Sequence, residues 1–130
     1  IVGTGKEEKK LKKIAPINVK FTGFVSEEKL IELYSHALIF CLPSIAETFG
    51  FVHLEAMASG CAIISTCPLP YKGIKIEPCN VDQLVEAIEY LMNNRKKAER
   101  MGRQNRKIVK RYNWERFISN LIKIYESLLR

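Results

Sequence analysis

The chain has 130 residues, of which 47% are hydrophobic, and it carries a formal net charge of +7 at pH 7. This composition excludes intrinsic disorder, and the length suits one small domain or part of a larger one. No apolar run approaches the roughly 18 residues that a membrane-spanning helix requires, and we expect no secretory leader.

The chain opens on Ile1-Val2-Gly3-Thr4-Gly5, a pattern typical of the end of a buried strand and its turn into a helix. Because a native protein seldom begins inside a core strand, we expect a fragment or a shortened gene product. The third glycine of a dinucleotide-binding Gly-x-Gly-x-x-Gly fingerprint would fall on Glu8, so the segment predicts a tight turn instead.

The first half of the chain then alternates between helical and extended patterns. Residues 6–15 predict a basic helix, and the alternating residues 19–25 predict a strand. Ser26 is a suitable N-cap for the next helix, whose apolar side chains we expect to face the core. The apolar run over residues 37–42 predicts a strand that is covered on both faces.

The second half continues the alternation. A helix from about Gly50 to Ser59 ends at Gly60, which suits a left-handed C-cap. Two further strands are predicted, a buried one over residues 61–66 and a short one over residues 74–77. Asn80 and Gln83 form a capping-box-like pair that opens a helix to about Met92. One more helix is predicted from about Arg95 to Arg111, and a last one from Asn113 onward. Strands that alternate with helices predict an α/β fold, a Rossmann-like parallel sheet flanked by helices.

The four cysteines, Cys41, Cys61, Cys67 and Cys79, form no Cys-x-x-Cys pair, and no histidine stands at zinc-finger spacing from them. Cys41 and Cys61 lie in strand-like runs, where a free thiol behaves as a small hydrophobe. We therefore predict reduced, buried thiols in a cytoplasmic protein, with no disulfide framework and no metal site.

The most informative segment joins a buried strand to the start of an Ala-rich helix. Glu47 precedes the helix in a loop, and Glu55 follows inside its second turn. The glycine between them permits close backbone approach, and the N–H groups of Gly50, Phe51 and Val52 are unpaired donors at the positive end of the helix dipole. The segment predicts a site for an anion such as a diphosphate, with carboxylates available to the hydroxyls of a ribose or a sugar.

These residues resemble a known family. Phe40-Cys-Leu-Pro-Ser44, Glu47-Thr-Phe-Gly50 and Leu54-Glu-Ala-Met-Ala-Ser-Gly60 read much like the Glu-x7-Glu region of family 4 type glycosyltransferases (group 1 glycosyltransferases), which have two Rossmann-like domains in the GT-B arrangement. The resemblance covers nearly the whole chain but only the later part of the family's C-terminal domain. It implies that residues 1–130 are a partial GT-B C-terminal, nucleotide-sugar-binding domain.

The resemblance also implies roles for individual residues. Glu47 corresponds to the glutamate that faces the donor sugar, and it is the catalytic candidate. Main-chain groups of residues 50–52 would contact the donor phosphate, and Glu55 would bind the nucleotide ribose. Val25, at the end of its predicted strand, looks like the position that lines the base.

The chain departs from the family pattern in two places. The resemblance implies that the N-terminal, acceptor-binding domain is missing. It implies the same for the first strand–helix unit of the C-terminal domain, which usually provides an Arg and a Lys to the diphosphate. The loop after Thr66 usually contains paired glycines and a glutamate, whereas residues 67–73 run quickly to the next strand. This shortening affects the sugar side of the pocket more than the nucleotide side.

Two other features have simpler interpretations. We interpret His36 and His53 as packing or surface histidines and not as catalytic residues. The side chain of His53 diverges from that of Glu55 by roughly 200° around the helix, so the two do not face one site. Residues 95–111 carry nine basic residues and one acidic residue. That face suits solvent, the favoured interpretation, or an anionic membrane surface. A nucleic-acid-binding domain is disfavoured because the basic residues lack interleaved aromatic residues.

By resemblance, the whole protein is a retaining glycosyltransferase that transfers a hexosyl group from a UDP-, GDP- or ADP-sugar to a glycan or lipid-linked acceptor, without a cofactor or bound metal. This chain would supply one wall of the donor site and depend on the missing N-terminal domain. The alternative is a non-catalytic nucleotide-binding or regulatory module of the same fold. We expect a cytoplasmic enzyme, placed at the inner face of the membrane if the basic helix contacts lipid.

Overall fold

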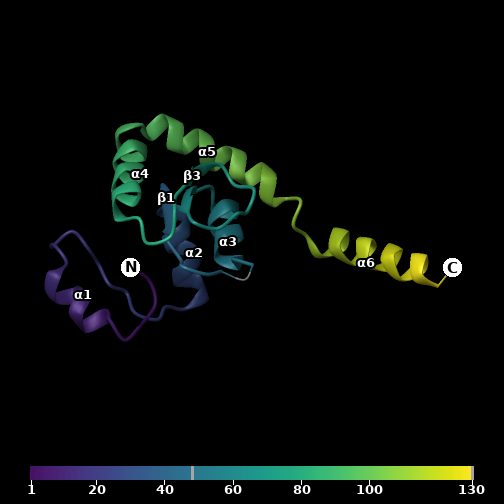
Figure 1. Ribbon diagram of the computed structural model, residues 1–130, viewed down its shortest axis with the longest axis horizontal. Helices are drawn as coiled ribbons and strands as arrows, with labels where there is room; N and C mark the ends of the chain where they lie inside the picture. Colours follow the sequence, from purple (N-terminus) through teal and green to yellow (C-terminus); the bar gives the residue numbers. More distant parts are fainter. Residues whose placement is uncertain (48, 130) are drawn as a thin grey trace. The chain divides into compact units, whose positions relative to one another are not determined.

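The computed structural model describes residues 1–47 and 49–129. The chain separates into two compact units, Ile1–Leu33 and Tyr34–Arg130. Along the chain, the helices and strands follow one another in this order (Figure 1): α1 (Glu8–Ile14), α2 (Glu27–His36), β1 (Ile39–Leu42), α3 (Phe51–Ser59), β2 (Ala62–Ser65), β3 (Gly73–Lys75), α4 (Val81–Asn93), α5 (Arg95–Val109) and α6 (Trp114–Leu128).

In the first unit, the strand predicted over residues 19–25 is wrong. Residues 19–25 do not form a strand; they contribute only isolated bridges between Gly23 and residues 2–3. Thr22 N–H donates to Ile1 O at 3.0 Å, and Gly3 N–H donates to Gly23 O at 2.8 Å. Gly3 has a left-handed backbone, with φ 101°, so the extended partner segment turns at this residue.

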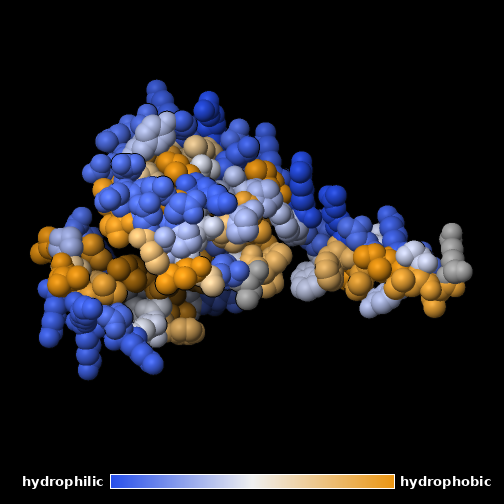
Figure 2. All heavy atoms as spheres, in the orientation of Figure 1, coloured by the Kyte–Doolittle hydropathy of each residue, from blue (hydrophilic) through white to orange (hydrophobic). Residues whose placement is uncertain are grey.

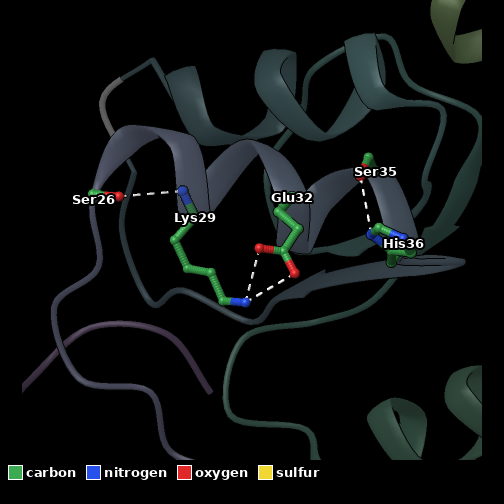
Figure 3. A network of polar contacts seen from close by, with 5 residues as sticks. All are labelled: Ser26, Lys29, Glu32, Ser35 and His36. Carbon is green, nitrogen blue, oxygen red and sulfur yellow. Dashed lines mark hydrogen bonds and ion pairs between the residues drawn. The ribbon is translucent and has the colours of Figure 1, made fainter.

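Helix α2 begins at the predicted cap. Lys29 N–H donates to Ser26 Oγ at 3.3 Å, and Lys29 Nζ pairs with the Glu32 carboxylate at 2.8 Å (Figure 3). A hydrogen bond from Ser26 also lowers the pKa of Glu28, a residue of the first turn. We expected the apolar side chains of this helix to face the core, but Ile31 is 58% exposed.

The second unit contains a parallel sheet of three strands in the order β1-β2-β3. Phe40 lies opposite Ile63, and Ile64 lies opposite Ile74. Parallel neighbours need a crossover between them, and α3 supplies the one from β1 to β2. The predicted parallel α/β sheet is therefore confirmed.

The central strand β2 is buried on both faces. On one face, Ala62 and Ile64 belong to a cluster with Ala87 and Leu91 of α4 and Ala98 of α5. On the other face, Ile63 packs in a second cluster, which includes Ala56 and Met57 of α3. Helices on both faces explain why the strand reads as a continuous apolar run.

The outer strands and the cysteines differ from expectation. Strand β1 is only partly covered, and Cys41 within it is exposed because β1 lies at an edge of the sheet. Cys79 is also exposed, whereas Cys61 and Cys67 are buried. All four thiols are free, and the expectation that all of them are buried is wrong for Cys41 and Cys79.

The later helices begin where their caps were predicted. Gln83 N–H donates to Asn80 Oδ1 at 3.0 Å, and Gln83 Oε1 accepts the N–H of Glu77 at 2.8 Å. At α6, Arg116 N–H donates to Asn113 Oδ1 at 2.8 Å. The side chains of Asn80 and Asn113 thus each satisfy a donor that the first turn of a helix leaves unpaired, whereas Gln83 bonds Glu77 ahead of the helix.

Helix α6 is amphipathic, with apolar side chains along one side and polar ones along the other (Figure 2). Its large apolar residues are exposed, among them Trp114, Phe117, Ile122 and Leu128. Within residues 1–47 and 49–129, no helix combines the length and apolar character needed to cross a membrane.

Candidate functional site

The loops that follow β1 and β2 are bonded to each other at the carboxyl ends of these strands. Ser65 Oγ donates to Leu42 O at 3.0 Å, and Thr66 Oγ1 donates to Ser44 O at 2.6 Å. In open α/β sheets, this edge is where ligands bind. The structure thus places the predicted anion site at the appropriate end of the sheet.

Gly50 makes the turn that starts α3. It is buried and left-handed, with φ 76° and ψ 50°. A Cβ at this position would lie 2.5 Å from His53 Nδ1 and 3.4 Å from Glu47 Cγ. Both the backbone angle and the space therefore require glycine.

The first backbone donors of α3 lack a side-chain cap, because glycine occupies the N-cap position. His53 N–H donates to Gly50 O at 2.9 Å. The N–H groups of Phe51 and Val52 precede it, and they belong to the donors that helix geometry leaves unpaired. Phe51 is 68% exposed and Val52 is 36% exposed. A helix start of this kind can donate to an acceptor outside the helix.

His53 is fully buried beneath this turn, as expected of a packing histidine. Its ring lies edge-on to Phe40, with centroids 5.6 Å apart, and its Nε2 is 2.7 Å from Ser65 Oγ. Burial lowers the pKa of His53, while the Gly50 carbonyl and the Glu47 carboxylate oppose that shift. The imidazole therefore links the turn to the end of β2.

The two predicted carboxylates flank the turn and are both exposed. Glu47 lies in the loop. Its Cγ would be 3.4 Å from a Cβ at Gly50, and its charge acts to raise the pKa of His53. Glu55 lies inside α3, and its Oε2 accepts the hydroxyl of Tyr34 at 3.2 Å. The structure thus places both carboxylates on the segment around the start of α3.

Val25 belongs to a different unit of the chain from the other predicted site residues. It is half-buried and belongs to the first unit, whereas residues 47–55 belong to the second. Because the strand that should end at Val25 does not form, its proximity to the base remains a prediction.

Sequence reasoning missed the contribution of Ser65. This residue is the polar end of an otherwise apolar buried strand, which is a signal that could have been noticed. Besides its bond to Leu42 O, its Oγ accepts Cys67 N–H at 3.1 Å. Its carbonyl accepts the hydroxyl of Tyr71 at 2.9 Å, and burial raises the pKa of Tyr71 to about 12.

Asn105 of α5 binds both ends of the segment from Cys61 to Lys72, which contains the short loop after β2. The Asn105 side chain is fully buried. The Asn105 amide donates to Cys61 O and Lys72 O at 2.8 Å each, and its Oδ1 accepts Lys72 N–H at 2.6 Å. The loop that differs from the family pattern is therefore anchored to the core.

In the described ranges 1–47 and 49–129, no group of three or more His, Cys, Asp or Glu is arranged to hold a metal ion. A cavity of about 340 Å³ lies between β3 and α4. None of the predicted site residues lines it; its walls include Ile74, Gln83, Glu86 and Tyr90.

Comparison with known proteins shows the family of this chain. The family described as glycosyl transferases group 1 matches residues 1–108. An uncharacterised glycosyltransferase of Methanocaldococcus jannaschii is 26% identical over 98% of this chain and 40% of its own length. The phosphatidyl-myo-inositol mannosyltransferase of Mycobacterium leprae is also 26% identical, over 98% of this chain and 37% of its own length.

Among solved structures, the sucrose-phosphate synthase of Thermosynechococcus elongatus superimposes with a TM-score of 0.82 at 26% identity, over 98% of this chain and 37% of that one. This likeness confirms the predicted GT-B type of α/β fold. The chain spans 40% or less of the length of these three proteins.

Proposed function

The chain belongs to the group 1 glycosyl transferases, and from that premise we propose that the whole protein transfers a hexosyl group from a nucleotide-diphosphate sugar to a glycan or lipid-linked acceptor. The donor is a UDP-, GDP- or ADP-sugar, and the anomeric configuration is retained. Residues 1–130 form part of the donor-binding domain, and a second, acceptor-binding domain of the whole protein completes the site. The reaction takes place in the cytoplasm.

One observation carries this proposal: the buried, left-handed turn at Gly50 presents the start of α3 at the carboxyl edge of the sheet. The N–H groups of Gly50, Phe51 and Val52 supply hydrogen bonds to the donor diphosphate there. Phosphate charge grows as the bond from the sugar to the diphosphate breaks. Fixed donors and a helix dipole aimed at that charge lower the barrier to transfer.

The flanking carboxylates recognise the uncharged parts of the donor. Glu55, fixed on the helix, accepts hydrogen bonds from the ribose hydroxyls. Glu47, in the loop ahead of Gly50, faces the sugar and acts in the transfer itself. Val25 contacts the base.

The experiment is a binding and turnover panel on the whole protein. Calorimetry with UDP, GDP and ADP should show clear binding of one of them, and Gly50→Ala should weaken that binding. Nuclear magnetic resonance of the product formed from the matching α-linked nucleotide sugar should show an α-anomer. The proposal fails if none of the three diphosphates binds; binding without turnover of any sugar donor would instead identify a nucleotide-binding module.

A further inference from the structure

A hydroxyl from a different helix contacts the carboxylate of Glu55. Tyr34, near the end of α2, donates its hydroxyl to Glu55 Oε2 at 3.2 Å. The two residues are separated by 21 positions in the sequence but lie in the same compact unit. This contact is not needed to cap α3 or to satisfy a buried atom, because Glu55 is exposed.

The phenol of Tyr34 is rigidly placed. Its ring packs against Phe40, with centroids 5.9 Å apart, and against the cluster that contains Met57 and Ile63. Its backbone carbonyl also accepts the thiol of Cys61 at 3.6 Å. Burial and the neighbouring Glu55 carboxylate raise the pKa of Tyr34, so the hydroxyl keeps its proton and remains a donor.

Glu55 has the opposite character. An exposed glutamate on a helix samples several rotamers, and ordering it when a ligand binds opposes binding. The hydrogen bond from Tyr34 occupies one carboxylate oxygen and restricts those rotamers beforehand. Among residues 1–47 and 49–129, no hydrogen bond to Glu55 Oε1 is present, so this oxygen remains available to a ligand hydroxyl.

We propose that Tyr34 is a positioning residue for the donor nucleotide: its hydroxyl orients Glu55 so that the carboxylate accepts the ribose diol. The inference rests on the proposed function, since it assigns Tyr34 to the same donor site. Tyr34 itself does not contact the reacting atoms. Its effect reaches the ligand through Glu55 alone.

The test is a double-mutant cycle of Tyr34→Phe and Glu55→Ala in the whole protein. Calorimetry uses UDP, GDP and ADP, and the 2′,3′-dideoxy counterpart of whichever binds most tightly. Phenylalanine keeps the ring and removes only the hydroxyl. We expect Tyr34→Phe to weaken ribonucleotide binding by about three- to tenfold, the range of one hydrogen bond, and to leave dideoxynucleotide binding unchanged. In the Glu55→Ala background, Tyr34→Phe should have no further effect.

Tyr90→Phe on α4 is the matched control, because it removes a phenol hydroxyl outside the site; it should leave nucleotide affinity unchanged. Equal losses for ribo- and dideoxynucleotides with Tyr34→Phe would overturn the inference, since they would indicate a general structural effect. An additive double mutant would also overturn it. If Glu55→Ala itself leaves ribonucleotide binding intact, the role proposed for Glu55 fails first.

Discussion

The imidazole Nε2 of His53 lies 2.7 Å from the hydroxyl of Ser65, and this contact joins helix α3 to strand β2 beneath the Gly50 turn. Ser65 donates its proton to Leu42 O, so a neutral ring must donate from Nε2. Its Nδ1 then faces Gly50 O at 3.3 Å without a proton to share. A protonated ring would satisfy both contacts, but burial disfavours the charge. The turn is therefore held by a neutral histidine.

This arrangement predicts a loss of stability in mild acid. Because burial lowers the pKa of folded His53, the unfolded chain binds more protons near pH 6 than the folded chain does. The stabilisation is complete above the unfolded pKa, about 6.5, and is lost as the pH falls through the folded pKa. The melting temperature should fall between about pH 7.5 and about pH 5.5, and part of that fall should disappear in His53→Gln.

The exposed His36 provides the control for this measurement. His36→Asn should show the same acid-induced fall in melting temperature as the unmodified protein. A His53→Gln protein whose melting temperature falls by as much as the unmodified one would show that other groups cause the effect.

Gly50→Ala should destabilise the protein and weaken nucleotide binding together. The new methyl group would overlap the ring of His53 and occupy a left-handed backbone position, which together cost about 1–3 kcal/mol. Gly5→Ala is the matched control, because a Cβ at Gly5 meets open space. Urea unfolding measures both; equal effects of the two substitutions would contradict the assigned strain.

Asn105→Ala should lower the free energy of unfolding by more than about 2 kcal/mol. The substitution removes the amide donors to Cys61 O and Lys72 O and the acceptor of Lys72 N–H, and the bond to Cys61 O is buried. Gln104→Ala, an exposed neighbour on α5, should change stability by less than about 0.5 kcal/mol. Similar unfolding curves for the two variants would refute the anchoring role.

The two carboxylates should separate in their effects on binding and turnover. Glu55→Ala should weaken nucleotide affinity about tenfold or more, as expected for a lost charge-assisted hydrogen bond. Glu47→Ala should leave nucleotide affinity nearly unchanged and reduce kcat for sugar transfer. Calorimetry and steady-state kinetics of the whole protein check this; unchanged affinity in Glu55→Ala would contradict the assignment.

The basic side of α5 is exposed to solvent, and Figure 2 shows polar side chains along this helix. We expect it to remain solvated, so the protein should not co-sediment with anionic phosphatidylglycerol vesicles at physiological salt, where the Debye length is roughly 8 Å. The opposite result would be vesicle binding that depends on the charges of α5. Binding would then be lost when the charges of Arg100, Arg103, Lys107 and Lys110 are reversed, but not when those of Lys9 and Lys13 on α1 are reversed. That outcome would show that α5 contacts the membrane.

The sequence alone determined the local features of this protein. The caps at Ser26, Asn80 and Asn113 and the buried strand β2 depend on residues close together in the chain, where sterics and hydrogen bonding act over a few positions. The order of Glu47, Gly50 and Glu55 around the start of α3 is likewise local. The continuous apolar run of β2 predicted cover on both faces because only such a strand avoids exposing apolar side chains.

Only the tertiary structure decided which distant groups meet. Tyr34 reaches Glu55 across 21 positions, and Asn105 reaches Cys61 across 44, separations at which no periodic pattern carries information. The same reason explains the incorrect strand at residues 19–25: its alternation is suitable, but a strand needs a partner, and pairing at Gly23 extends only to residues 2–3. Local chemistry defines what each segment can form, and long-range packing determines which of those structures persist.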